Sequence, residues 1–449
     1  MDYMEKDMVP KESETIAAKR AARLAEKIRE GKNFVIQRTW WSNSAFEILV
    51  ILSILSLNLY QITPFFGTSA KDSFYSGPVI PLLAKLIELF GISLSVSLQT
   101  VNIFFYSFFP LTFYLFTRKI SGRKAVAVLA SLFVILPFYP FSYVRVAGSL
   151  AGVDSPHIAS LSITPIALLL FFSFLTLGKV NSLIGAAIAS AFVALVSPFG
   201  FMIFLIFAFI LTFSEMLLGS GRLKLVRAVS VFIFAAGLTS FWYNPVFFLW
   251  ILTGPLGIDI RYTMGKLIPV SFFTLPVLGA FGYLLFDRKS DLQTVFLASF
   301  FTISFALISL AGGGIFPSHP SRYVAELGIS LSFLLSVSLV KLVDYLSLRE
   351  NKLGKIISQS TFSKMGLMGL FITLVLTILV YKDRLNMFEG SVLGIWEGID
   401  KGSIWQAKER YSGGLASGLG YFISLISVLI LGIVAKRSLG NISKKSGVS

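Results

Sequence analysis

Twelve long apolar segments constrain what this chain can fold into. Most are close to the roughly 17–25 residues that a helix needs to cross a bilayer. Only 14% of the residues are charged and 55% are hydrophobic, with a mean hydropathy of +0.79, whereas soluble domains carry about 25% charged residues. These values exclude a single soluble domain, a disordered chain and a nucleic-acid-binding module. The predicted fold is an all-α, polytopic membrane helix bundle of about 12 transmembrane helices. The predicted spans are residues 45–62, 97–117, 125–144, 158–177, 183–197, 200–218, 227–243, 268–286, 292–311, 324–345, 365–381 and 414–435.

Residues 183–218 could be read as one apolar segment or as two. A single segment of this length is too long for one span. Ser197-Pro198-Phe199-Gly200 lies in its middle and is typical of a break between helices. We therefore predict two spans, and merging them would invert every later loop.

The distribution of basic residues supports this topology. With the N-terminus inside, 28 of the 39 lysines and arginines fall on inside segments, as the positive-inside bias requires. Both termini are therefore expected to be cytoplasmic, in a multi-pass protein of the cell membrane. We divide the chain into a basic N-terminal segment (1–44), a transmembrane bundle (45–435) and a basic tail (436–449).

The N-terminal segment contains a helical pattern at residues 12–32, rich in Ala, Glu, Lys and Arg. A basic helix of this kind can dock a protein partner or lie on anionic lipid, and it can also be simply solvated. Met1 is followed by charged residues, so no cleavable signal peptide is expected.

The first outside loop contains Asp72, and residues 79–90 follow it as an amphipathic stretch too short to span. We predict that this stretch forms a helix along the outer membrane surface. A carboxylate near that surface can act as a general base or hold a divalent cation. Asp72 can equally cap a turn.

Asp154 and His157 lie three residues apart after the third span. An Asp and a His at this spacing could share a metal ion or a proton. Pro156 lies between them, which favours Asp154 or Ser155 as the N-cap of the next helix. Arg145, a few residues earlier, could contact a phosphate.

Arg322 and Glu326 stand at the outer start of the tenth span. The planar fork of an arginine holds two phosphate oxygens, and the free N–H groups of a helix start add positive potential. The two side chains are four residues apart and could instead pair with each other. Arg261, in another outside loop, is a further candidate for phosphate binding, while Glu326 and Asn102 are the best candidates for polar groups inside the membrane.

The order of these features resembles the transmembrane module of the GT-C superfamily of membrane glycosyltransferases, over residues 45–345. The resemblance rests on the outer acid Asp72, the Pro-led stretch 77–83, the basic inside turn 118–124, the Ser197-Pro198 break and Arg322-Tyr323 before a late span. It implies a GT-C-like fold with an outward-facing site for a polyprenyl-phosphate-linked sugar. It also implies hexosyl or pentosyl transfer, with Asp72 as base (Asp154 and His157 in reserve) and with Arg322 on the lipid phosphate. A divalent cation is a possible cofactor.

Two alternatives stay open, because active members usually carry paired acids in the first outer loop whereas this chain has Asp72 alone. The first is a non-catalytic subunit or scaffold of an envelope or glycosylation complex. The second is a transporter of lipid-linked oligosaccharide. The chain has no cysteine, two histidines, and no GxxxxGK, HExxH or GxSxG motif, so an ATP-driven pump and a membrane metalloprotease have no support.

Overall fold

The structure is a computed structural model of the full chain. It describes residues 47–71, 77–152, 154–218, 221–253, 289–310, 320–349, 359–387 and 413–446, together with residues 45, 261 and 265. The chain divides into two units, residues 1–53 and 54–449. Little of the first unit is described beyond a helical stretch at residues 47–53, and the predicted N-terminal helix and segment 1–44 lie outside the described residues.

The described residues are helical and contain no strand. Seven helices are long and apolar enough to cross a membrane, which confirms the prediction of an all-α, multi-pass bundle. The count of twelve spans and the GT-C-like fold stay predictions, and the predicted span 268–286 lies outside the described residues. The seven are α3 (Leu94–Ser121), α6 (Ser155–Leu177), α8 (Pro198–Leu218), α12 (Lys289–Leu310), α13 (Val324–Arg349), α14 (Gln359–Tyr381) and α17 (Gly414–Ser446).

The predicted span 125–144 is wrong as a single helix. Helix α4 (Lys124–Val134) ends well before residue 144, and α5 (Ser142–Val146) and the π-helical turn η2 (Ala147–Ala151) follow it. The reason is local: Pro137 and Pro140 have no N–H to donate, and each biases the residue before it away from the helical region. The chain therefore turns at this point and leads back into the bundle.

The predicted break at residues 197–200 is confirmed. Helix α7 (Val180–Val196) ends before Ser197, and α8 begins at Pro198. The Ser197 hydroxyl accepts a hydrogen bond from the Gly200 N–H (3.2 Å), as an N-cap does. A Cβ at Gly200 would lie 1.8 Å from the Ser160 Oγ of α6, so glycine allows the start of α8 to approach α6 closely.

The amphipathic stretch predicted after the first loop forms α2 (Val79–Glu88). Ile80 and Ala84 are buried against Val101 and Phe105 of α3. Leu82 and Leu86, on another face, are exposed. A helix of ten residues is about 15 Å long, half the hydrocarbon thickness, so α2 cannot span, as predicted.

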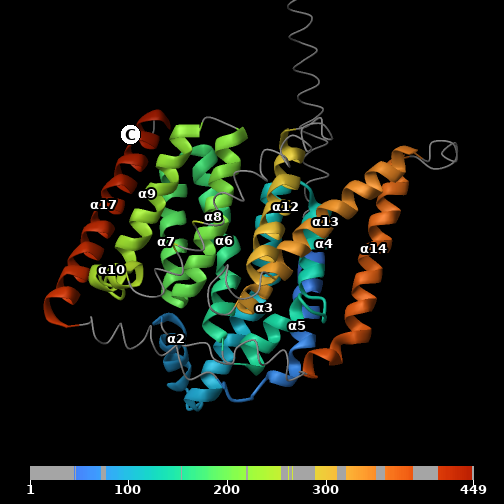
Figure 1. Cartoon of the computed structure of the whole chain (residues 1–449), viewed down its shortest axis with the longest axis horizontal. Coiled ribbons are helices and arrows are strands. Elements are labelled where there is room, and N and C mark those ends of the chain that lie inside the picture. Colours follow the sequence, from blue (N-terminus) through green and yellow to red (C-terminus); the bar gives the residue numbers. More distant parts are fainter. Residues whose placement is uncertain are drawn as a thin grey trace, which may run out of the picture. The chain divides into compact units, whose positions relative to one another are not determined.

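Helix α6 packs against α3, α7 and α8, and α13 packs against α12 and α4 (Figure 1). Helix α9 (Gly221–Thr239) packs against α7, and α10 (Pro245–Thr253) contacts α17. Helices α14 and α17 are mostly exposed, with only 11% and 17% of their apolar windows buried. Long apolar helices that leave this much surface uncovered are typical of contact with lipid.

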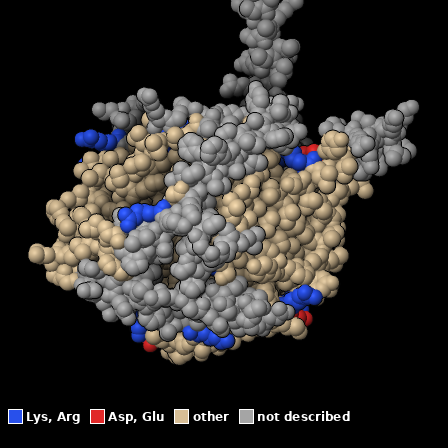
Figure 2. Space-filling model, viewed as in Figure 1, with Lys and Arg blue, Asp and Glu red and all other residues tan. Residues whose placement is uncertain are grey.

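The surface in Figure 2 is consistent with this arrangement. Apart from one blue patch at mid-height on the left, the blue and red side chains lie toward the top and the bottom of the view, and the exposed flanks that the figure colours are mostly tan. Charges at two ends of an apolar flank are expected for a protein that crosses a membrane.

Candidate functional site

Four of the predicted site residues come together at the start of two helices. Asp154 directly precedes α6, and His157 lies in its first turn. Arg322 belongs to the short turn η3 (Pro320–Tyr323), and Glu326 lies in the first turn of α13. We call Asp154, His157, Arg322 and Glu326 the charged cluster.

The local sequence explains why the two helix starts meet. Pro156 occupies the first turn of α6, where its missing N–H is not needed. On α13, a Cβ at Gly328 would lie 2.2 Å from the Pro140 carbonyl oxygen. Glycine at this position lets α13 lie directly against the turn that leads into α5, only two residues from Glu326.

The cluster is a continuous chain of short contacts. Arg322 donates from Nε to Asp154 Oδ2 (2.8 Å) and from Nη2 to Oδ1 (2.6 Å), a bidentate pair. His157 Nδ1 lies 2.9 Å from Asp154 Oδ2, and His157 Nε2 lies 2.5 Å from Glu326 Oε1. The imidazole is therefore held between two carboxylates that come from helices far apart in the sequence.

An aromatic side chain from a third helix completes the cluster. The Phe199 ring, on α8, lies under the Arg322 guanidinium at 3.6 Å and meets the His157 ring edge-on at 4.7 Å. The centre of the Tyr323 ring lies 5.3 Å from the centre of the Phe199 ring. The cation–π contact is favourable. The guanidinium of Arg322 can bind another anion only if Asp154 releases it.

The cluster balances its charge internally. Both carboxylates can accept from the imidazole only if both ring nitrogens carry protons, so two cations then face two anions. Burial alone would raise the pKa of the Asp154 carboxyl, but the charges and hydrogen bonds of Arg322 and His157 hold that pKa well below its ordinary value. Asp154, His157 and Glu326 are each at most 1% exposed, while the Arg322 side chain is 14% exposed.

One acceptor of the cluster is unused within the described part of the chain. Glu326 Oε2 is buried and has no hydrogen-bond partner there, and neither has the hydroxyl of Ser330, one turn further along α13. Buried polar atoms are normally satisfied. Two unpartnered oxygens one turn apart on one helix indicate a position where a polar group of a ligand, or a water molecule, can bind.

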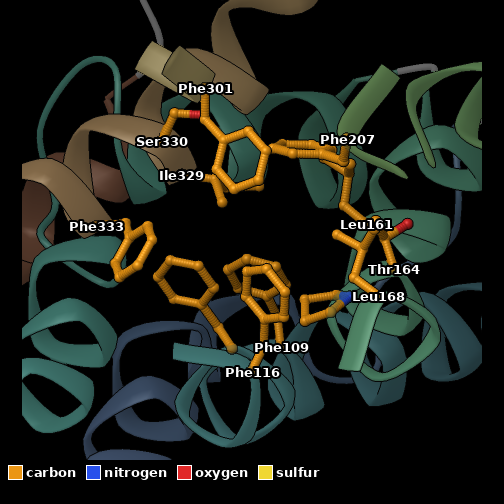
Figure 3. Close-up of a pocket in the computed structure, with 12 residues that line it drawn as sticks. Phe109, Phe116, Leu161, Thr164, Leu168, Phe207, Phe301, Ile329, Ser330 and Phe333 are labelled. Atoms are coloured by element: carbon orange, nitrogen blue, oxygen red, sulfur yellow. The ribbon is translucent and has the colours of Figure 1, made fainter. Parts of the chain in front are cut away.

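An apolar cavity of about 360 Å³, its open side included, lies one helical turn beyond the cluster (Figure 3). On α6 it begins at Leu161, four residues after His157, and on α13 at Ile329 and Ser330, three and four residues after Glu326. Figure 3 shows rings from several helices pointing toward the same space. The aromatic lining residues are Phe109, Phe113, Phe116, Phe207, Phe301 and Phe333.

The helix-cap interpretation of Asp154 is wrong in its chemistry. Asp154 does occupy the N-cap position of α6, but its side chain makes no capping hydrogen bond. The carboxylate is turned to Arg322 and His157, and the Ser155 hydroxyl donates to the Ser149 carbonyl oxygen instead (2.9 Å). A bidentate charged partner outcompetes a single capping bond.

The alternative pairing of Arg322 with Glu326 is also wrong. Arg322 pairs with Asp154, and Glu326 binds His157. Arg322 lies in the η3 turn and not in α13 itself, so the two residues do not have the helical spacing that the sequence suggested.

Of the other predicted residues, Arg145 is held elsewhere in the bundle. Arg145 is 1% exposed; it donates to the Val134 carbonyl oxygen (2.7 Å) and lies over the Phe109 ring at 4.3 Å, which joins α5 to the end of α4. Arg261 is exposed, and most of its chain neighbours lie outside the described residues. Asp72 also lies outside the described residues, so its role as base stays a prediction. Asn102 is fully buried in α3.

The cluster does not fit a divalent cation. Both Asp154 oxygens accept hydrogen bonds from Arg322. The positive charge of the guanidinium therefore lies where a metal ion would have to bind, and it would repel that ion. Within the described ranges, no group of three or more His, Asp or Glu side chains is arranged to hold a metal ion. The predicted cation stays a prediction and has no place in this cluster.

Phe199 has no signal of its own in the sequence. It is part of the break after α7, and nothing in a single sequence pairs position 199 with position 322. No protein-family model matches the chain, and no curated protein matches it.

Proposed function

We propose that the protein binds a polyprenyl-phosphate-linked sugar at the charged cluster and transfers the sugar to an acceptor. The observation that carries the proposal is the contact chain Arg322–Asp154–His157–Glu326, which assembles a phosphate-binding cation and an acid–base group at one point of the bundle. The resemblance to GT-C glycosyltransferases supplies the reaction class.

Arg322 is the group best suited to the phosphate. It is the only member of the charged cluster with more than 1% of its side chain exposed. Its guanidinium is already oriented by Phe199 and by the bidentate contact with Asp154. Two phosphate oxygens can accept the same pair of hydrogen bonds from a guanidinium as a carboxylate does. The ligand would therefore replace Asp154 as the partner of Arg322, and Asp154 would keep its contact with His157.

The position of the cavity supports an amphipathic ligand. A charged group at the cluster and a small apolar group at the phenylalanine-lined cavity would lie along the same two helices, α6 and α13. Ligand sites are commonly apolar with a few convergent polar groups. A lipid phosphate supplies both the charged group and the apolar part, whereas a free sugar supplies neither.

The reaction needs one proton transfer. The acceptor hydroxyl gives its proton to a carboxylate as its oxygen attacks the anomeric carbon, and the bond from that carbon to the phosphate oxygen breaks. The polyprenyl phosphate leaves with the electron pair, and its charge is stabilised by Arg322. Glu326, with its free oxygen, and Asp72 are the two candidate bases.

The test is binding of a short polyprenyl phosphate to the full chain in nanodiscs, followed by isothermal titration. Arg322→Gln should weaken binding by about 1.5–3 kcal/mol, the usual value of a charged hydrogen bond, or roughly tenfold to a hundredfold. The matched control is Arg384→Gln, because Arg384 also lies over aromatic rings (Phe138 and Tyr381) but is exposed and outside the cluster. Equal loss in both variants would refute the assignment of Arg322.

A second candidate function is proton-linked transport, and a specific observation favours it. A fully buried histidine between two carboxylates inside a helical membrane bundle is the kind of group that carries protons in transporters. Proteoliposomes separate the two functions: proton uptake that depends on Glu326 without any transfer product favours transport, and transfer without a proton gradient favours the glycosyltransferase.

A further inference from the structure

A second pocket lies where the turn between α3 and α4 meets α12 and α13. It has a volume of about 230 Å³ with its open side included. Two cationic side chains line it, Arg123 before α4 and Lys341 on α13, together with the hydroxyls of Ser121 and Thr294. It is separate from the charged cluster, and the proposed transfer reaction does not use it.

The polar side of the pocket is held in place by local hydrogen bonds. The Ser121 hydroxyl accepts from the Arg123 N–H (3.2 Å) and donates to the Thr117 carbonyl oxygen (2.7 Å). The Thr294 hydroxyl donates to the Ile120 carbonyl oxygen (3.3 Å), which connects α12 to the end of α3. These contacts fix the backbone turn from which the Arg123 side chain extends.

The other side of the pocket is apolar. Val126, Val337 and Val340 line it, each at most 3% exposed. Polar and cationic groups therefore face an apolar wall across one small space. This is the pattern expected where a lipid headgroup meets the start of its acyl chain.

The turn beside the pocket carries further basic residues. Lys119 and Lys124 lie on the same turn and are exposed. Asp344, which forms an ion pair with Arg123, is the carboxylate that competes for these cations in the described part of this region. Both members of that pair are only about two-thirds buried, so the pair is weak and an incoming anion can displace it.

We propose that this pocket binds the phosphate of an anionic phospholipid, with Arg123 and Lys341 as its cationic contacts. The acyl chain stays in the surrounding lipid, since the three valines are each at most 3% exposed. Basic pockets between transmembrane helices on the cytoplasmic side bind such headgroups, and the predicted topology assigns this turn to that side. Asp344 occupies Arg123 when no lipid is bound.

The proposal is tested by titrating the detergent-solubilised full chain with phosphatidylglycerol and counting bound lipids by native mass spectrometry. Lys341→Gln should weaken lipid binding by about fivefold, since one basic residue contributes about 1 kcal/mol to anionic-lipid attraction. The matched control is Lys119→Gln, which removes the same charge from the turn that carries Arg123, outside the pocket. Lys341→Arg should restore binding.

Asp344→Asn gives the result that separates binding from a structural role. It removes the competing carboxylate, so lipid binding should become tighter. If the pair with Arg123 were purely structural, the substitution would weaken lipid binding instead. Phosphatidylcholine and inorganic phosphate serve as two further probes at the same concentrations. Equal effects of Lys341→Gln and Lys119→Gln, weaker binding in Asp344→Asn, or displacement of the lipid by inorganic phosphate would each overturn the proposal.

Discussion

Asp154→Asn should strongly destabilise the protein, because Asp154 is the shared anion of the charged cluster. Its carboxylate receives Arg322 at 2.6 and 2.8 Å and faces His157 at 2.9 Å, with 1% of the side chain exposed. Removing one partner of a buried ion pair costs about 3–5 kcal/mol, since the other charge is left uncompensated. The lower value, about 3 kcal/mol, is expected here because the Arg322 side chain retains 14% exposure and asparagine can still accept one hydrogen bond.

The assay is equilibrium unfolding of the full chain in mixed micelles. The matched control is Asp344→Asn, which breaks the half-exposed pair with Arg123 and should cost less than about 1 kcal/mol. Adding Arg322→Gln to Asp154→Asn should recover about 2 kcal/mol, as residues of one network are coupled by up to about 3 kcal/mol. The reasoning is refuted if Asp154→Asn costs no more than Asp344→Asn, or if the two cluster substitutions are additive.

Three further predictions concern topology, packing and pH. A reporter placed after Asn351 should lie inside and one after Gly390 outside; an inside signal at Gly390 contradicts the predicted topology from residue 197 onward. Gly328→Ala should destabilise the folded protein by about 1–3 kcal/mol through overpacking, since its Cβ would lie 2.2 Å from a backbone oxygen. Gly369→Ala, whose Cβ would have nothing within 4 Å, should stabilise it by about 0.5–1 kcal/mol. Unfolding free energies that change in the same direction in both variants would contradict the packing. The pKa of the Asp154 carboxyl is lowered in the folded protein. The stabilisation by Asp154 should therefore be fully present above about pH 4, the pKa of an unfolded aspartate, and be lost only as the pH falls further toward the folded pKa. A stability difference between wild type and Asp154→Asn that already declines between pH 7 and 5 contradicts this.

Much of the fold can be predicted from the apolar segments. Where the prediction is wrong, the cause is local. The break at Ser197-Pro198 was predicted because proline and serine at that point act through the backbone alone. The span 125–144 was wrong because hydropathy stays high through Pro137 and Pro140 while the helix cannot continue through them. Composition measures how apolar a segment is, and backbone chemistry decides whether it is one helix.

The candidate site was predicted residue by residue but not as a set of contacts. Asp154 and His157 were identified from the spacing of an acid and an imidazole, Arg322 from its place at a helix start, and Glu326 as a polar group in an apolar span. Their partners were not, since both favoured alternatives used neighbours in sequence: a helix cap for Asp154 and an i,i+4 pair for Arg322. The actual partners are 168 and 169 positions apart, so only tertiary packing brings them into reach.

The close approach at Gly328 has a consequence for how the site can respond to a ligand. Helix α13 carries Glu326, then Gly328 against Pro140, then Ser330 at the apolar cavity, all within two turns. Packed backbones in direct contact deform little, so α13 cannot shift to admit a phosphate. The adjustable parts are the side chains of Arg322 and Asp154, which can exchange partners without moving a helix. Ligand entry therefore depends on the strength of that one ion pair, and Asp154→Asn should free Arg322 for phosphate while it destabilises the fold. Tighter phosphate binding together with lower stability in the same variant is the combination that a binding role requires, and a purely structural pair would lose both.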